Sequence, residues 1–399
     1  MPINYKKLVK LYENHGAQAD GLMRESILAK DIAPGEFDFG RLFEECFGWE
    51  EFRACRSDKS RLVTEHVFEA AGAVSTAAFQ KISGQIVYGL TLEGYQNEDF
   101  VFSKIVPEYQ STVQFEKVAS LSNIGPGTDA DWTVAEGDPY GYAGFGQDWI
   151  NLPDTIKRGK IVAVTREAIF YDRTGKVQEQ ARSIGYALGQ NGEIRAIDCI
   201  IDENGGAKSA AVGGHRYHWQ DTSIASYNDN SGTHSWDNLA ASNGLVDWTD
   251  LDVADQVLNE IVNPFTGMPV EISAPYLICT KQREKTAKRI LESTTLHVVT
   301  PGYATSGNPT LHDGRNPYAG TFEILSSRLL AQRMATDTTW YYGDVRKAFR
   351  RVVHFPFQTI SAPANNADEF NRDIVLQERA DVKDAFAVVN PRYMVKCTE

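Results

Sequence analysis

A long segment rich in glycine, aspartate and aromatic residues, residues 122–155, restricts the fold of this chain more than any other feature. The alternation in STVQFEKV, which ends at Val118, predicts a strand before it, and KIVAVTREAIFY at 160–171 predicts a strand after it. A loop of this length without its own core is uncommon in a compact domain and usually has a function. Because an isolated two-stranded hairpin is marginally stable, we expect an extended hairpin that lies on a neighbour.

Five aromatic residues fall within eighteen residues of this segment, where the surrounding glycines and aspartates offer no local core. Aromatic side chains are favoured as anchors of protein–protein interfaces. We therefore predict that the following residues bury themselves on another copy of the chain: Trp132, Tyr140, Tyr142, Phe145 and Trp149. The alternative is a compact surface loop that folds on its own aromatic residues.

Helical periodicity appears on both sides of this hairpin. A short helix is expected near residues 6–12, within a charged N-terminal region, and a longer one over 64–90, where apolar residues recur every three or four positions. They are Val67, Ala71, Val74, Ala78, Ile82 and Ile86. A third helix is expected from Thr174, its N-cap, to about 196, although Gly185, Gly189 and Gly192 each weaken an isolated helix by about 1 kcal/mol.

The remainder resembles an α/β arrangement followed by two terminal strands. We expect a helix over 251–262, a strand over 269–280 and a helix directly after it that is capped by Thr280. Further strands are predicted at 296–300, 338–342 and 352–359, and residues 374–399 predict a strand, a polar turn and a last strand.

Charge and cysteine content exclude some classes of protein. A formal net charge of −13 argues against a protein that mainly grips phosphate, because such affinity comes from Lys and Arg. The five cysteines are scattered without a CxxC pair, which favours reduced thiols over a disulfide framework or a zinc site. The N-terminus has no apolar signal region, so we expect a cytoplasm-like setting, and the start at Met1 leads us to expect that no N-terminal piece is removed.

The sequence contains only incomplete matches to the motifs of known enzyme classes. His215 and His218, with Asp221 nearby, form an HxxH pattern, but a metal site needs a third ligand and fixed geometry. The glycine-rich segment 139–146 lacks the GK[ST] ending of a phosphate-binding loop. The segment 189–198 lacks the preceding strand that a dinucleotide-binding site requires. We therefore expect that the protein is not an enzyme and that it binds no cofactor and no metal. We interpret Asp250 and Asp252 as acidic residues at the N-terminus of a helix, where the helix dipole favours negative charge.

The order of these elements resembles a known family. The cues are GKIVAVTREAIFYDRTG at 159–175, the strand–helix unit at 263–291, WYYGDVRKAF at 340–349, RADVKDAFAVVNPRYMVK at 379–396 and the helix AFQKISGQIVYG at 78–89. Together they resemble the Mu-like major head subunit family of tailed bacteriophages, which has the Hong Kong 97 type of capsid fold.

The resemblance implies an α+β chain that self-assembles into an icosahedral shell around double-stranded DNA. It implies an N-terminal arm or assembly segment (1–63), an N-terminal helix region of a peripheral domain (64–102), an extended loop (103–166), a spine helix (167–199), an axial domain (200–370) and C-terminal peripheral strands (371–399). The implied partners are other copies in hexamers and pentamers, a portal, scaffold or decoration proteins, and packaged DNA by non-specific proximity. Two alternatives stay open: an encapsulin-type compartment of the same fold, and a cytosolic metal-dependent enzyme.

Some capsids of this fold join their subunits through Lys–Asn isopeptide bonds. Lys117, Lys157 and Lys160 lie in or near the hairpin, but their spacing selects none of them. We therefore expect no covalent cross-link.

Overall fold

The computed structural model describes residues 4–15, 18–29, 32, 34–50, 53, 73–112, 117–119, 132–140, 149–165, 176–202, 216–229, 236–263, 266–300, 310–334, 336–361 and 374–399. They form two compact units, and three of the five chain boundaries between the units fall within α11 (Lys176–Ile201), β13 (Phe349–Ser361) and β14 (Ile374–Val388). Unit 1 comprises Met1–Phe100, Ile156–Gly192 and Phe355–Lys383, and unit 2 comprises Val101–Thr155, Glu193–His354 and Asp384–Glu399. The mixed helix and sheet content agrees with the predicted fold class.

Unit 1 is built around a helical cluster. Three short helices pack on one long helix, and their bounds are α1 (Tyr5–His15), α2 (Gln18–Leu28), α3 (Phe39–Phe47) and α7 (Ala73–Tyr95). The buried core includes Met23, Leu42, Phe43, Ile82 and Ile86. Ile82 and Ile86 confirm the predicted apolar face of the long helix, whereas Val67 and Ala71 lie outside the described residues.

Helix α11 runs without interruption through Gly185, Gly189 and Gly192, although glycine has a low helix propensity. The buried positions in its first half include Ala181, Gly185 and Gly189, about one turn apart, and the two glycines contact α7. A Cβ atom at Gly185 would collide with the backbone carbonyl of Thr91 on α7. The glycines therefore permit two helix backbones to approach closely, which compensates for their poor helix propensity.

Strands from distant parts of the chain meet in a four-stranded sheet with the order β1-β13-β14-β4, where β1 is Glu108–Gln110 and β4 is Ile156–Thr165. Within unit 1, the backbones of Gly159 on β4 and Ala380 on β14 lie in close contact. Lys157 Nζ lies 2.8 Å from Oδ2 of Asp381, whose side chain is almost fully buried.

Unit 2 contains a five-stranded sheet with helices on both faces. Its order is β11-β8-β12-β15-β7, and the strands are Glu323–Ser327, Tyr276–Thr280, Trp340–Gly343, Met394–Cys397 and Leu239–Ala240. Side chains alternate between two cores, because successive strand residues point to opposite faces. One core takes Ile278, Tyr341 and Met394, and the other takes Leu277, Trp340 and Val395.

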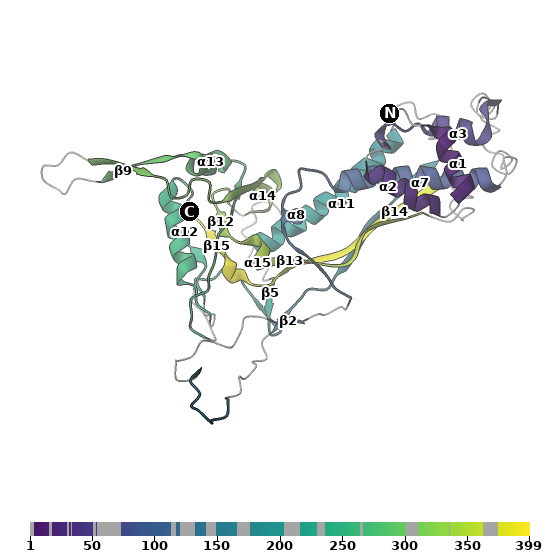
Figure 1. Cartoon of the computed structure of the whole chain (residues 1–399). Helices are drawn as coiled ribbons and strands as arrows, with labels where there is room; N and C mark the ends of the chain where they lie inside the picture. The colour runs from purple at the N-terminus through teal and green to yellow at the C-terminus, as the bar shows by residue number, and fades with distance from the viewer. Residues whose placement is uncertain are drawn as a thin grey trace. The chain divides into compact units, whose positions relative to one another are not determined.

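Helices cover this sheet at its two faces. The second core is closed by α12 (Trp248–Glu260) and α13 (Glu284–Glu292), and the first core receives α14 (Arg328–Arg333), α15 (Val345–Ala348) and the end of α11. β9 (Thr295–Thr300) and β10 (Thr310–Arg315) pair only with each other and extend away from α13 as a ribbon (Figure 1). The helix α8 (Phe102–Ile105) and the turn η2 (Pro391–Tyr393) complete the unit, together with a sheet described below.

Buried polar side chains fix the chain segments of unit 2. Glu193 is fully buried on α11, and its carboxylate accepts hydrogen bonds from the backbone N–H groups of Val101, Phe102 and Ser103 at 2.8–2.9 Å, so it caps α8. Asn238 is also fully buried, and its side-chain amide donates to the carbonyls of Ser226, Pro391 and Met394. These bonds join distant chain segments through buried side chains whose polar atoms are satisfied.

Two local predictions are wrong. Only Tyr276–Thr280 of the predicted strand 269–280 is a strand, because Pro269 and Pro275 cannot donate to a central ladder. Thr280 does not cap the next helix. Its hydroxyl donates to the carbonyl of Asp337, and α13 begins at Glu284 after the N-cap Arg283.

Other predictions are confirmed with shifted bounds. The helix expected at 251–262 is α12, which Asp247 and Asp250 close with a capping box. This agrees with the interpretation of Asp250 as part of an acidic helix start. The strand–turn–strand end of the chain is formed by β14, η2 and β15. Among the described residues, no helix is both long and apolar enough to cross a lipid bilayer.

Candidate assembly interface

The base of the long hairpin is a short antiparallel pair in unit 2. β2 (Lys117–Ala119) pairs with β3 (Trp149–Asn151), with Val118 opposite Ile150. β3 continues to β5 (Tyr217–Trp219) and β6 (Thr222–Ile224) in a four-stranded sheet. The chain between β2 and β3, which we call the excursion, therefore leaves and re-enters unit 2 at adjacent points. The return strand differs, because the segment predicted at 160–171 is β4, which neighbours β14 instead.

Apolar contacts anchor this base to the body of unit 2. Leu152, Val352 and Ala387 form a small buried cluster, and Tyr109 and Val118 pack against it. β1 joins the same region by parallel pairing with β13, with Tyr109 opposite Val352. The hairpin is thus held at its root by residues that are far apart in the sequence.

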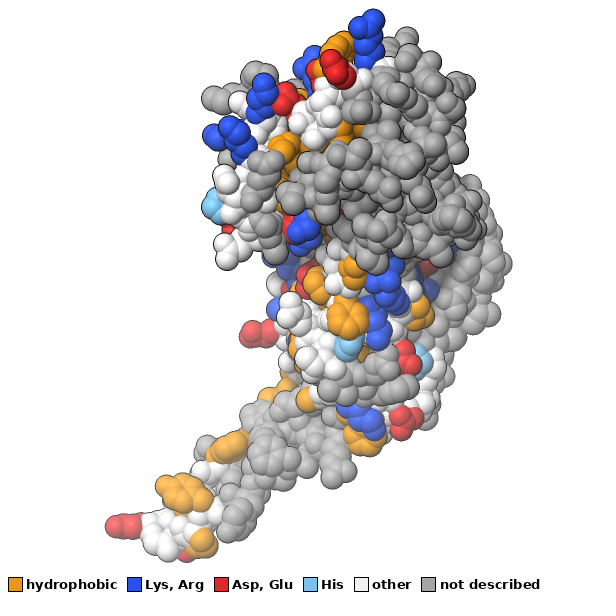
Figure 2. Space-filling view, turned by 90° about the vertical axis from the view of Figure 1, so that its right-hand side faces the viewer, with side chains coloured by type: hydrophobic (Ala, Val, Ile, Leu, Met, Phe, Trp, Pro, Cys, Tyr) orange, Lys and Arg blue, Asp and Glu red, His pale blue; other side chains and the backbone are white. Residues whose placement is uncertain are grey.

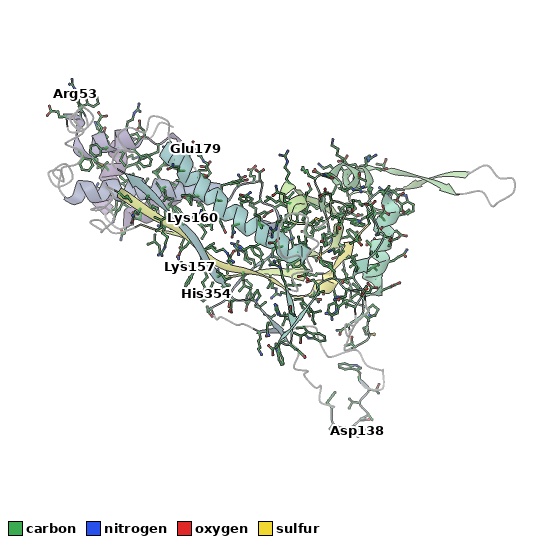
Figure 3. All side chains as sticks on the ribbon, turned by 180° about the vertical axis from the view of Figure 1, so that it is seen from behind. Arg53, Asp138, Lys157, Lys160, Glu179 and His354 are labelled. Carbon is green, nitrogen blue, oxygen red and sulfur yellow. The ribbon has the colours of Figure 1, made fainter. Side chains whose placement is uncertain are left out.

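Residues 132–140, the described part of the excursion, are almost entirely exposed. Trp132 is 61% exposed and Tyr140 is 84% exposed, so neither ring enters a core of its own chain. Glu136 and Asp138 lie between them and are exposed too, and Asp138 is labelled in Figure 3. The segment lies at the bottom of the view in Figure 2, where hydrophobic side chains are orange and acidic ones red. A ring exposed to this degree is what an unoccupied interface anchor looks like before association.

The other aromatic candidates have different surroundings. Trp149 lies on β3 and is half-buried, and Lys117 Nζ lies 4.4 Å from the centre of its ring. Tyr142 and Phe145 lie outside the described residues. The structure therefore brings Trp132 and Tyr140 together on one exposed segment, and it places Trp149 at the root of the hairpin.

A buried ionic cluster in unit 2 was not predicted. Asp384 on β14 is fully buried and lies 2.8 Å from Arg195 of α11 and 3.0 Å from Arg351 of β13. Arg351 also pairs with Glu108 of β1 at 2.6 Å, and both guanidinium groups lie over the ring of Phe386. The acidic and basic residues of RADVKDAF do not by themselves predict a buried ionic cluster, because charged residues on a strand are usually exposed to solvent. Through these ion pairs the cluster connects α11, β13, β14 and β1.

The residues that suggested an enzyme do not assemble in the described part of the chain. His218 lies on β5 opposite Ser223, and His215 lies outside the described residues. Among the described side chains, no group of three or more His, Cys, Asp or Glu residues could hold a metal ion. Cys199, Cys279 and Cys397 are buried free thiols, and burial raises the pKa of Cys199 and of Cys279 to about 12. These two thiols are therefore protonated at neutral pH and poor nucleophiles.

Comparison with known proteins settles the family. Residues 152–397 match the sequence profile of the family described as phage capsid protein. The chain belongs to the phage capsid protein family. Phage capsid proteins are structural proteins rather than enzymes. The match includes α11, the five-stranded sheet and the buried ionic partners Arg195, Arg351 and Asp384, and it excludes α1–α3, α7 and the strand pair β2–β3.

Several solved structures are similar to this member of the phage capsid protein family. The virus-like particle from Pyrococcus furiosus is 11% identical, with 78% of this chain and 98% of that chain covered and a TM-score of 0.40. The protein of Gordonia phage Cozz is 12% identical (75% and 86% covered, TM-score 0.43), and the capsid of a native GTA particle is 11% identical (75% and 90% covered, TM-score 0.44). No curated protein matches the sequence.

Proposed function

We propose that this chain is the major capsid protein of a tailed bacteriophage and that it self-assembles into the icosahedral shell around double-stranded DNA. The observation that carries the proposal is the exposed segment 132–140, with Trp132 and Tyr140 on an excursion whose base is fixed in unit 2. The family match supports the phage shell over an encapsulin-type compartment, because its members are described as phage capsid proteins. The sequence cues favour the Hong Kong 97-type fold and its Mu-like branch.

Assembly of this kind needs large contacts that repeat around different symmetry axes. Obligate interfaces bury about 2,000–5,000 Å² in total, and each Å² of apolar area contributes about 25 cal/mol before the costs of association. An extended hairpin supplies such area without enlarging the domain. Each copy then donates one hairpin and receives another, which is a heterologous contact that can close rings.

The remaining partners follow from this role. Hexamers and pentamers of the chain would form the shell, with a portal, scaffold or decoration proteins as further partners. A chain with net charge −13 would face packaged DNA without strong adhesion, since non-specific affinity depends on Lys and Arg. We place the mature protein in the virion and its assembly in the host cytoplasm, and we assign it no enzymatic activity.

Replacing both exposed aromatic residues, Trp132→Ala with Tyr140→Ala, should raise the protein concentration needed for assembly at least about tenfold. An interface anchor is worth about 2 kcal/mol or more when it is truncated, and 1.4 kcal/mol is a factor of ten. Light scattering and size-exclusion chromatography of the purified variants measure the effect. Phe355→Ala removes an aromatic ring that is 47% exposed outside the hairpin and is the matched control. Equal assembly of the double variant and the unmodified chain would contradict the proposed role of the hairpin.

Boiled particles should give a single band at 44.4 kDa on a denaturing gel, because we expect no covalent bond between subunits. Lys157 is already paired with Asp381, and Lys117 lies over Trp149 (Lys157 and Lys160 are labelled in Figure 3). Bands at multiples of the monomer mass that persist under reducing conditions would show that this expectation is wrong.

A further inference from the structure

Charge is divided between two neighbouring segments of unit 2. Residues 246–275 contain six acidic residues and no Lys, Arg or His. Residues 281–292 contain five basic residues and two acidic ones. The first segment carries α12 and the second carries α13. The chain as a whole has a negative net charge. The concentration of basic residues on α13, soon after a segment that has none, therefore requires an explanation.

The fold places these two helices at opposite edges of one sheet. α12 packs on β15 and β7, at one end of the strand order, and α13 packs on β11 and β8, at the other end. Both helices contribute to the same buried core, α12 through Leu251 and Leu258 and α13 through Ala287 and Ile290. They therefore lie on the same face of the sheet and flank it (Figure 1).

The charged side chains of both helices reach solvent. On α12, Asp252 and Glu260 are exposed, and Val253 beside them is 43% exposed. Val246 and Met268 add exposed apolar area next to this helix, at 68% and 44%. We call the surface formed by Val246, Asp252, Val253, Glu260 and Met268 the acidic edge.

The opposite surface is formed by α13. Lys285, Lys288 and Arg289 are exposed on its outer side, and we call them the basic edge. Lys288 lies 2.7 Å from Glu284, which also pairs with Lys281, so Glu284 holds part of this positive charge in place. Lys285 and Arg289 extend the positive surface on the exposed side of α13.

We propose that the acidic edge of one copy docks on the basic edge of the next, so that copies join head to tail around a rotation axis. The inference rests on the proposed function and names one contact that builds the rings of the shell. Complementary charges attract the correct pair of edges, while two like edges repel, which disfavours a two-fold dimer through either helix. A head-to-tail contact is the type that closes into rings.

Reversing the charge of one edge tests the proposal. The basic-edge variant carries Lys285→Glu and Arg289→Glu, and the acidic-edge variant carries Asp252→Lys and Glu260→Lys. Each variant alone should need at least about a tenfold higher concentration to assemble at low salt, because every contact then joins like charges. A chain with all four substitutions should assemble as the unmodified chain does.

A mixture of the two variants gives the sharper result. In alternating order, each contact again joins opposite charges, so an equimolar mixture should assemble although neither component does. Alternation closes in rings with an even number of members and fails in five-membered rings. Electron microscopy of the mixture should therefore show six-membered rings, sheets or tubes rather than closed shells.

The control changes net charge equally at a distant surface. Arg346→Glu with Lys347→Glu alters two exposed residues of α15, on the other face of the sheet, and this variant should assemble normally. Circular dichroism identifies any edge variant that does not fold, and Lys285→Gln with Arg289→Gln or Asp252→Asn with Glu260→Gln then replaces it, with weaker assembly expected. Normal assembly of folded single-edge variants, or a mixture that does not recover, overturns this inference alone. Failure of the unmodified chain to assemble overturns the proposed function as well.

Discussion

Replacing Asp384 by alanine should lower the free energy of unfolding by about 3–5 kcal/mol, the range measured when one partner of a buried ion pair is removed. Asp384 is fully buried between Arg195 and Arg351, which are themselves only 16% and 11% exposed. Without the carboxylate, two largely buried guanidinium groups lie close to the same Phe386 ring and lose the charge that they share. Urea unfolding of the unassembled subunit, at one fixed protein concentration, measures the loss.

Asp154→Ala is the matched control for this experiment, because Asp154 is an exposed aspartate of the same unit. A surface substitution of this kind should change the free energy of unfolding by no more than about 0.5 kcal/mol. If Asp384→Ala were as mild as Asp154→Ala, the ionic cluster would not hold α11, β13 and β14 together as described.

Gly185→Ala should destabilise unit 1 by about 1–3 kcal/mol or more, since overpacking a tight contact forces the backbone to move. The added methyl group would meet the carbonyl of Thr91 on α7, and backbone cannot rotate away as a flexible side chain can. The neighbouring contacts of Gly94 with Arg182 and of Gly189 with Tyr95 leave the crossing of α7 and α11 little freedom to adjust. The melting temperature of the subunit reports the effect.

Gly21→Ala on α2 provides the opposite expectation in the same unit. Nothing lies within 4 Å of a Cβ atom at this helical position. Alanine has a higher helix propensity than glycine by about 1 kcal/mol, so this change should stabilise the protein slightly. Equal effects of the two substitutions would show that close helix approach at Gly185 is not the reason for its glycine.

These glycines also show what the sequence could and could not predict. Periodicity located the helix that begins near 176, but propensity alone made its second half doubtful. The reason for Gly185 and Gly189 is a tertiary contact with α7, about ninety residues earlier in the chain, and no local pattern reports such a contact. Propensity is a weak prior that packing regularly overrides.

The candidate interface was only partly predictable, because it too depends on contacts between distant parts of the chain. Aromatic residues among glycines and aspartates predicted exposure, and Trp132 and Tyr140 are exposed. Trp149 belongs to the root of the hairpin because β3 pairs with β2 and β5, a register that depends on a strand seventy residues later. The two charged edges were visible as composition in 246–275 and 281–292, but only the strand order reveals that they flank one sheet.

Cryo-electron microscopy of the purified chain tests the central claim most directly. We expect closed polyhedral shells in which the rings of Trp132 and Tyr140 are buried against a different copy of the chain. A monomeric protein that does not associate at high concentration, with both rings packed against its own domain, would contradict it.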